Sequence, residues 1–102
     1  MKEAKACENI HEIRECIDEI DEQILVSFGK RMEYVKEIVK FKTDADGIVA
    51  HDRQLQLLQK RREWAVESGL DPDLFEAMYK MLINWNVQKE MEIFRNKENA
   101  KN

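Results

Sequence analysis

One stretch decides the fold: residues 9–42, NIHEIRECIDEIDEQILVSFGKRMEYVKEIVKFK. It contains no proline, and its apolar residues recur at steps of three and four, the period of one buried face of an α-helix. Asn9 can cap the start, and the turn-forming residues TDADGI at 43–48 can end it. The stretch predicts one very long helix with this apolar stripe: Ile10, Ile13, Ile17, Ile20, Ile24, Phe28, Met32, Val35 and Val39.

The length of this helix predicts self-association. About 34 helical residues measure about 50 Å along the axis, whereas a chain of 102 residues folds alone into a body about 35 Å across. Much of the apolar stripe would then face water. We therefore expect an intertwined homodimer in which two long helices cover each other.

Two shorter helices are predicted after the long one. The first covers about residues 50–68 and is ended by Gly69. The second starts at Asp71-Pro72, an N-cap followed by proline at the first helical position. Residues 95–102, RNKENAKN, are predicted to be a frayed polar tail. The fold class is all-α, with three helices in a single domain over residues 1–102.

Composition and charge exclude several classes of protein. A net charge of −4 argues against a nucleic-acid partner, and no apolar run is long enough to cross a bilayer. Cys7 and Cys16 match no metal or redox spacing. The first residues, MKEAKACENIHEI, are charged throughout and have no signal-peptide core, so we expect a cytoplasmic protein.

Cations on the apolar stripe are the first functional signal. Arg31 and Lys42 point within about 40° of the centre of the stripe, and Arg14 lies near its edge. Long basic side chains can snorkel from a helix flank, but three on one stripe favour an anionic partner, because a buried cation needs one. Arg31 and Lys42 are about 16 Å apart along the axis and can converge on one small molecule, whereas Arg14, about 25 Å from Arg31, can reach such a site only from the partner chain.

Glu90 is the complementary signal on the last helix. It shares a face with Ile83, Val87 and Phe94, so we expect its carboxyl to be partly desolvated and its pKa to be raised. The alternative is a structural ion pair between Glu90 and one of the cations. Asn86 lies one turn before Glu90, on a neighbouring face.

The set of candidate residues favours binding over nucleophilic chemistry. His11 and His51 are the only histidines, and neither has a companion at ligand spacing, so we expect no metal site. Fixed cations suit the binding of a small dianion and the stabilisation of charge that develops on an oxygen.

Four motifs in order resemble one family. They are IRECIDEID (13–21), GKRMEYVKEIVKFK (29–42), WAVESGLD (64–71) and INWNVQKE (83–90). Together they resemble the all-helical chorismate mutase family (type II), and within it the isochorismate–pyruvate lyases of salicylate and siderophore synthesis. The resemblance covers about residues 10–95 and implies an intertwined dimer of three-helix chains. It also implies a pericyclic reaction that needs no cofactor.

The resemblance also implies roles for individual residues. Arg14 from the partner chain and Arg31 would hold the two carboxylates of the substrate, and Lys42 would lie at its enolpyruvyl ether oxygen. Arg53 would close over the ligand, and the loop 43–50 would act as a lid. The last helix would line the pocket with Asn86 and Glu90.

Two departures bear on the activity that the resemblance implies. Mutases of the family place an acid at the position of Ala50 and a glutamate at that of Gln54, and this chain has neither. We therefore favour elimination of pyruvate from isochorismate to give salicylate, with weak chorismate mutase activity, over a chorismate mutase that makes prephenate. A non-catalytic helical dimer that acts as an adaptor is the alternative outside enzymes. At position 90 the family frequently has glutamine, and a protonated Glu90 could donate to the ether oxygen.

Overall fold

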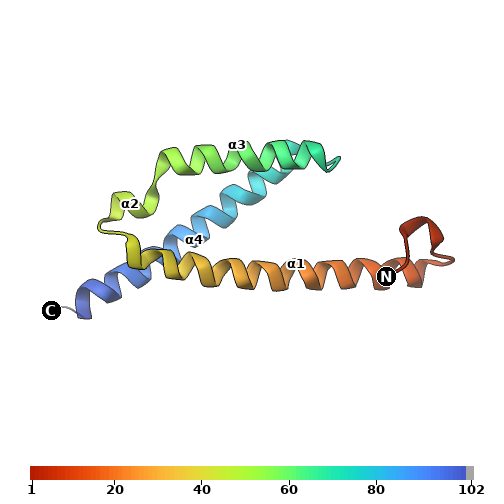
Figure 1. Cartoon of the computed structure of the whole chain (residues 1–102), viewed down its shortest axis with the longest axis horizontal. Helices are drawn as coiled ribbons and strands as arrows, with labels where there is room; N and C mark the ends of the chain where they lie inside the picture. Colours follow the sequence, from red (N-terminus) through yellow and green to blue (C-terminus); the bar gives the residue numbers. More distant parts are fainter. Residues whose placement is uncertain (101–102) are drawn as a thin grey trace. The chain divides into compact units, whose positions relative to one another are not determined.

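The computed structural model describes residues 1–100, and within them the chain is helical and contains no strand. The all-helical prediction is confirmed. Three long helices are joined by short elements (Figure 1), in this order: η1 (Ala4–Ala6), α1 (Ile10–Ile38), η2 (Val39–Phe41), α2 (Ala45–Val49), α3 (His51–Glu67) and α4 (Pro72–Ala100).

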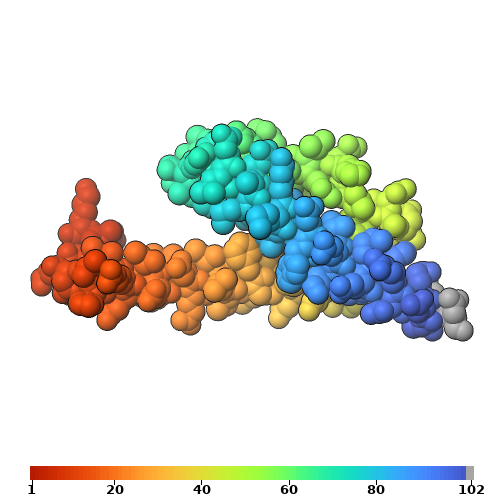
Figure 2. Space-filling view, turned by 180° about the vertical axis from the view of Figure 1, so that it is seen from behind, coloured from red at the N-terminus to blue at the C-terminus, as the bar shows by residue number. Residues whose placement is uncertain are grey.

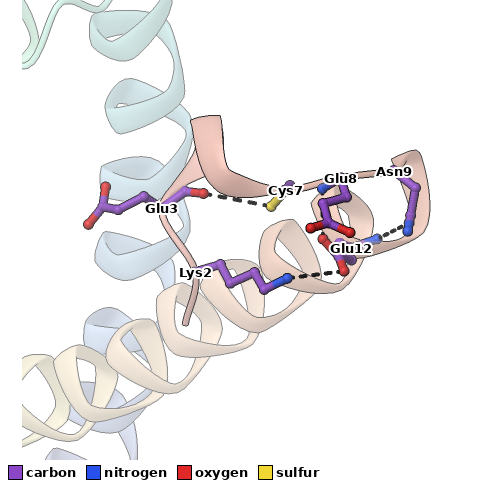
Figure 3. Close-up of polar contacts among 6 residues, drawn as sticks. All are labelled: Lys2, Glu3, Cys7, Glu8, Asn9 and Glu12. Atoms are coloured by element: carbon purple, nitrogen blue, oxygen red, sulfur yellow. Dashed lines mark hydrogen bonds and ion pairs between the residues drawn. The ribbon is translucent and has the colours of Figure 1, made fainter.

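The first helix begins where the sequence predicts. Asn9 caps α1, because its Oδ1 accepts the backbone N–H of Glu12 at 3.0 Å. The Glu12 carboxylate in turn accepts the backbone N–H of Glu8 at 2.8 Å and pairs with the Lys2 ammonium at 3.2 Å. These contacts fold the N-terminal residues back onto the first turns of α1 (Figure 3). At the other end, the last predicted turn of the long helix is the 3₁₀ turn η2.

The turn between α3 and α4 is built from the predicted signals. Gly69 takes a left-handed conformation with φ of 74°, and the N–H of Leu70 donates to the Ala65 carbonyl at 2.8 Å, which is a Schellman ending. Asp71 then accepts the N–H of Asp73 at 2.9 Å, and Pro72 opens α4. The chain reverses here, so that α3 packs along α4 (Figures 1 and 2).

A small apolar core and a cation–π cluster hold α3 against α4. Leu58 and Ala65 on α3 and Ile83 on α4 are buried. The guanidinium of Arg61 lies 4.7 Å from the ring centroid of Trp64 and 5.6 Å from that of Tyr79, so it links the two helices at distances where a cation and an aromatic face attract.

The structure differs from the prediction at two places. Residues 95–100 continue α4 as helix, because Arg, Lys, Glu and Ala are good helix formers and no Gly or Pro intervenes; positions 101 and 102 of the predicted tail lie outside the described residues. Within the predicted lid loop 43–50, residues 45–49 form the short helix α2.

Contacts within the chain group it into two compact units. The first is Met1–Tyr34, and the second begins at Val35 and contains η2, α2, α3 and α4. In the second unit both η2 and α2 pack on α4. None of the described helices combines the length and the apolar character needed to cross a membrane.

Candidate functional site

Two of the predicted cations lie on the continuous helix α1. Arg14 is exposed and Arg31 is half-buried. Both belong to the first unit, and 17 residues of uninterrupted helix separate them by about 25 Å along the axis. These two guanidinium groups therefore cannot bind the same small molecule within one chain.

Lys42 stands at the end of the 3₁₀ turn η2, in the second unit. Its backbone N–H closes the turn by donating to the Val39 carbonyl at 3.1 Å, and Val39 is fully buried. The side chain is half-buried, and its ammonium donates to the Gly47 carbonyl at 2.9 Å. The predicted cation is thus held against the segment that we expect to act as a lid.

The lid segment has its own local support. Asp44 caps α2 by accepting the N–H of Gly47 on Oδ1 at 2.7 Å. At the other end, Ala50 adopts a left-handed conformation with φ of 43°, which costs an alanine about 1–2 kcal/mol. The side-chain amide of Gln54 donates to the Val49 carbonyl and so ties the end of α2 to the first turns of α3.

Asn86 and Glu90 are buried polar residues on α4, with exposed fractions of 5% and 8%. They lie one turn apart and share the inner side of the helix with Ile83. The predicted desolvation of the Glu90 side chain is therefore confirmed. The two buried positions that the sequence assigns to the pocket thus lie on one side of α4 and remain candidates for function.

Arg53 lies in the first turns of α3 and is exposed. Together with Lys42, Asn86 and Glu90 it belongs to the second unit. The structure thus brings four of the six predicted residues into one unit and keeps Arg14 and Arg31 in the other.

The second unit also has a groove that is separate from the predicted site residues. It has a volume of about 350 Å³ and runs between α3 and α4, lined by His51, Gln54, Leu55, Leu58, Lys80, Ile83 and Asn84. None of the six predicted residues lines it. Among the described residues, no group of three or more His, Cys, Asp or Glu side chains is placed to hold a metal ion.

The thiols of Cys7 and Cys16 are free and half-buried in the first unit. Burial raises the pKa of Cys7, and the neighbouring Cys16 thiol and the Glu12 carboxylate raise it further, whereas Lys2 lowers it. A raised pKa leaves less thiolate at neutral pH, which is the opposite of an activated nucleophile. These cysteines give no support to nucleophilic chemistry.

The anchoring contacts around Lys42 are what the sequence reasoning missed. The stretch DADG (44–47) carried the signal, because an Asp three residues before the amide that it accepts is a typical N-cap. From the sequence, these residues are assigned to the turn that ends the long helix and to the lid loop, and Asp44 is not identified as a helix cap.

Comparison with known proteins gives consistent matches. Residues 13–91 match the family described as "Chorismate mutase type II". The chain is 35% identical over 100 residues to "Isochorismate pyruvate lyase" of Pseudomonas aeruginosa, a match that covers 98% of this chain and 99% of that protein. It is also 30% identical over 84 residues to "T-protein" of Haemophilus influenzae, which covers 81% of this chain and 22% of that protein.

Proposed function

We propose a function from one premise: the chain belongs to the chorismate mutase type II family. The proposed reaction is elimination of pyruvate from isochorismate, which leaves salicylate. The observation that carries this proposal is the 35% identity to an isochorismate pyruvate lyase, which extends over nearly the full length of both chains.

The lid segment supports the lyase over the mutase. Ala50 offers no polar side chain, and the Gln54 amide is engaged with the Val49 carbonyl. Neither position therefore presents a carboxylate to a ring hydroxyl of a substrate. Chorismate mutase activity is the second candidate, since the family match itself favours it, and we expect it to be the weaker activity.

The proposed site binds a small dianion with cations and uses one of them in the reaction. Arg31 and the partner's copy of Arg14 hold the two carboxylates, and Arg53 closes over the ligand. Lys42 lies at the ether oxygen, where charge develops as the C–O bond breaks, because a compact ammonium stabilises charge on a single oxygen well. The hydrogen moves within the substrate, so no covalent intermediate and no cofactor is required. A cytoplasmic location stays a prediction.

Glu90 has a proposed role as a hydrogen-bond donor. Burial disfavours the charged form of a carboxyl, and an ionised Glu90 would repel a dianionic substrate. We propose that it is protonated and donates a hydrogen bond to the ether oxygen, while the proton stays on its carboxyl. Glu90→Gln keeps a donor at all pH values, so the acidic activity optimum that we expect of the wild type should move toward neutral pH. An unchanged profile of kcat against pH would remove Glu90 from the mechanism.

A homodimer completes the proposed site. The five isoleucines of the α1 stripe are exposed in the single chain: Ile10, Ile13, Ile17, Ile20 and Ile24. A second exposed stripe on α4 consists of Leu74, Met78, Met81 and Trp85. Two copies that cover these surfaces would bring Arg14 of one chain to the site of the other, which the distance between Arg14 and Arg31 along α1 requires.

Mixed dimers test the shared site directly. We expect Arg14→Ala and Lys42→Ala each to be nearly inactive alone. A mixed dimer would contain one site that has both native residues, so an equal mixture after subunit exchange should recover about a quarter of wild-type activity. No recovery in a mixture that does exchange subunits would show that Arg14 does not serve the partner's site.

The decisive experiment is the product formed from each substrate. Purified chain is incubated with isochorismate or with chorismate, and salicylate fluorescence or loss of chorismate absorbance is followed. We expect salicylate from isochorismate as the faster reaction; prephenate alone would make the chain a mutase. Lack of turnover, and no thermal stabilisation by either substrate, would favour the adaptor.

Variants then assign the roles of the cations. Lys42→Ala should lower kcat most, and Arg31→Ala should mainly raise KM. Lys40→Ala is the matched control, because Lys40 is two residues away, is exposed and pairs with Glu37. Wild-type rates in both site variants would refute the assignment.

A further inference from the structure

The ammonium of Lys42 is anchored on the backbone of α2. It donates to the Gly47 carbonyl at 2.9 Å, and the last carbonyls of a helix have no partner within the helix. Lys42 therefore satisfies an acceptor of the short helix α2 while its own side chain is half-buried. The contact fixes the end of a side chain that otherwise has four rotatable bonds.

Gly47 is held from its other side by Asp44. The Asp44 Oδ1 accepts the Gly47 N–H at 2.7 Å, so one residue receives a carboxylate on its amide and an ammonium on its carbonyl. A Cβ at position 47 would lie 3.3 Å from that Oδ1 and 3.8 Å from Cδ of Lys42. The three residues are thus packed closely enough that a shift of Asp44 moves the acceptor of Lys42.

We propose that Asp44, acting through Gly47, is a positioning residue that sets the Lys42 ammonium for the ether oxygen of the substrate. The inference rests on the proposed role of Lys42 in the lyase reaction. An ammonium has three donors, and the Gly47 carbonyl takes one of them. Two remain for substrate oxygens, so the anchor orients the cation without having to be released.

A purely structural cap makes different predictions. If Asp44 only stabilised α2, its loss would lower thermal stability and weaken substrate binding in general. If it positions Lys42, its loss acts on the charge that develops in the transition state, so that kcat falls while KM changes little. The split between the two kinetic constants therefore separates the two roles.

The test uses the full-length chain and three substitutions. Asp44→Ala removes the cap, and Asp44→Asn keeps an oxygen that can cap while removing the charge. Asp71→Ala is the matched control, since Asp71 also caps a helix and accepts the Asp73 N–H at 2.9 Å, but at the start of α4.

We expect Asp44→Ala to lower kcat about fivefold, the factor that corresponds to the ~1 kcal/mol of a lost N-cap, with KM within about twofold of wild type. Asp44→Asn should restore kcat to within about twofold, because amide and carboxylate caps are of similar strength. Asp71→Ala should lower the melting temperature and leave kcat unchanged. An unchanged kcat in Asp44→Ala, no rescue by Asp44→Asn, or an equal loss in Asp71→Ala would each overturn the proposal.

A second readout does not depend on turnover. The rate at which an acylating reagent labels Lys42 is measured by peptide mass spectrometry, relative to the exposed Lys40. Labelling of Lys42 should accelerate in Asp44→Ala but not in Asp71→Ala, and unchanged labelling would show that Asp44 does not hold the cation. If the wild type converts neither substrate, the proposed function is wrong, and Asp44 cannot position Lys42 for that reaction. The labelling rates would still show, independently of turnover, whether Asp44 holds the Lys42 ammonium in place.

Discussion

Ile17→Glu places a carboxylate in the middle of the stripe that we propose as the dimer contact. Ile17 is 50% exposed in the single chain and has Ile13 and Ile20 as neighbours on the same face of α1. If the α1 helices of two chains cover each other along this stripe, the substitution should impair dimerisation without breaking any contact in the buried core of the single chain.

The exposed fraction sets the size of the effect. Fully burying an isoleucine contributes about 1.5–3 kcal/mol. Half of the surface of Ile17 is already covered within the single chain, so burial of the other half by the partner contributes about 1 kcal/mol. The dimer contains two copies of Ile17, so the total is about 2 kcal/mol. The loss of about 2 kcal/mol corresponds to a rise of about 30-fold in the dissociation constant, and the desolvation of two carboxylates adds to it.

Sedimentation velocity over a dilution series measures this constant. Val26→Glu is the matched control, because Val26 is 54% exposed but lies on the opposite, polar face of α1 beside Glu19, Glu22, Gln23 and Ser27. We expect the control to dimerise like the wild type. A wild type that stays monomeric, an unaffected Ile17→Glu, or an equal loss in Val26→Glu would each refute the reasoning.

Three further outcomes follow from local geometry. Ala50→Gly should raise the free energy of unfolding by up to about 1 kcal/mol, since relief of the left-handed strain exceeds the cost of the entropy that glycine adds to the unfolded chain. A melting temperature below that of the wild type would contradict this prediction. Gln54→Glu should destabilise the chain by about 1 kcal/mol at pH 7 but less at pH 4, because only a protonated carboxyl can donate to the Val49 carbonyl, and thermal melts at both pH values measure the difference. Alkylation of Cys7 at neutral pH should be slower in the folded chain than in urea, because burial and the adjacent Cys16 raise its pKa; equal rates by mass spectrometry would count against it.

The starts of α1 and α4 and the end of α3 could be predicted because their signals are local. Asn9, Gly69 and Asp71 each act through hydrogen bonds or backbone conformation within a few residues, and such signals are readable from sequence. The burial of Glu90 followed in the same way from its place in the apolar period of α4.

The short helix α2 could not be predicted by the same means. Five residues are too few to reveal a helical period, and an isolated helix of that length is unstable in water. It is held by side chains at both ends, with Asp44 and Lys42 on Gly47 and Gln54 on Val49. These contacts are local, and the Asp44 cap has a sequence signal in DADG, but the pattern of apolar residues does not reveal which side chains donate to Gly47 and Val49.

The residue at position 54 bears both on the anchoring of α2 and on the reaction that we propose. A glutamine there can donate to the carbonyl that ends α2, whereas an ionised glutamate could only accept and would leave that carbonyl without this donor. The Gln54 amide that donates to this carbonyl still has an oxygen that can accept, but that oxygen is neutral and is not the carboxylate that a mutase places at this position. The amide at position 54 and the missing acid at position 50 thus act in the same direction: neither position offers a carboxylate, and in the site that we propose the substrate is recognised by cations.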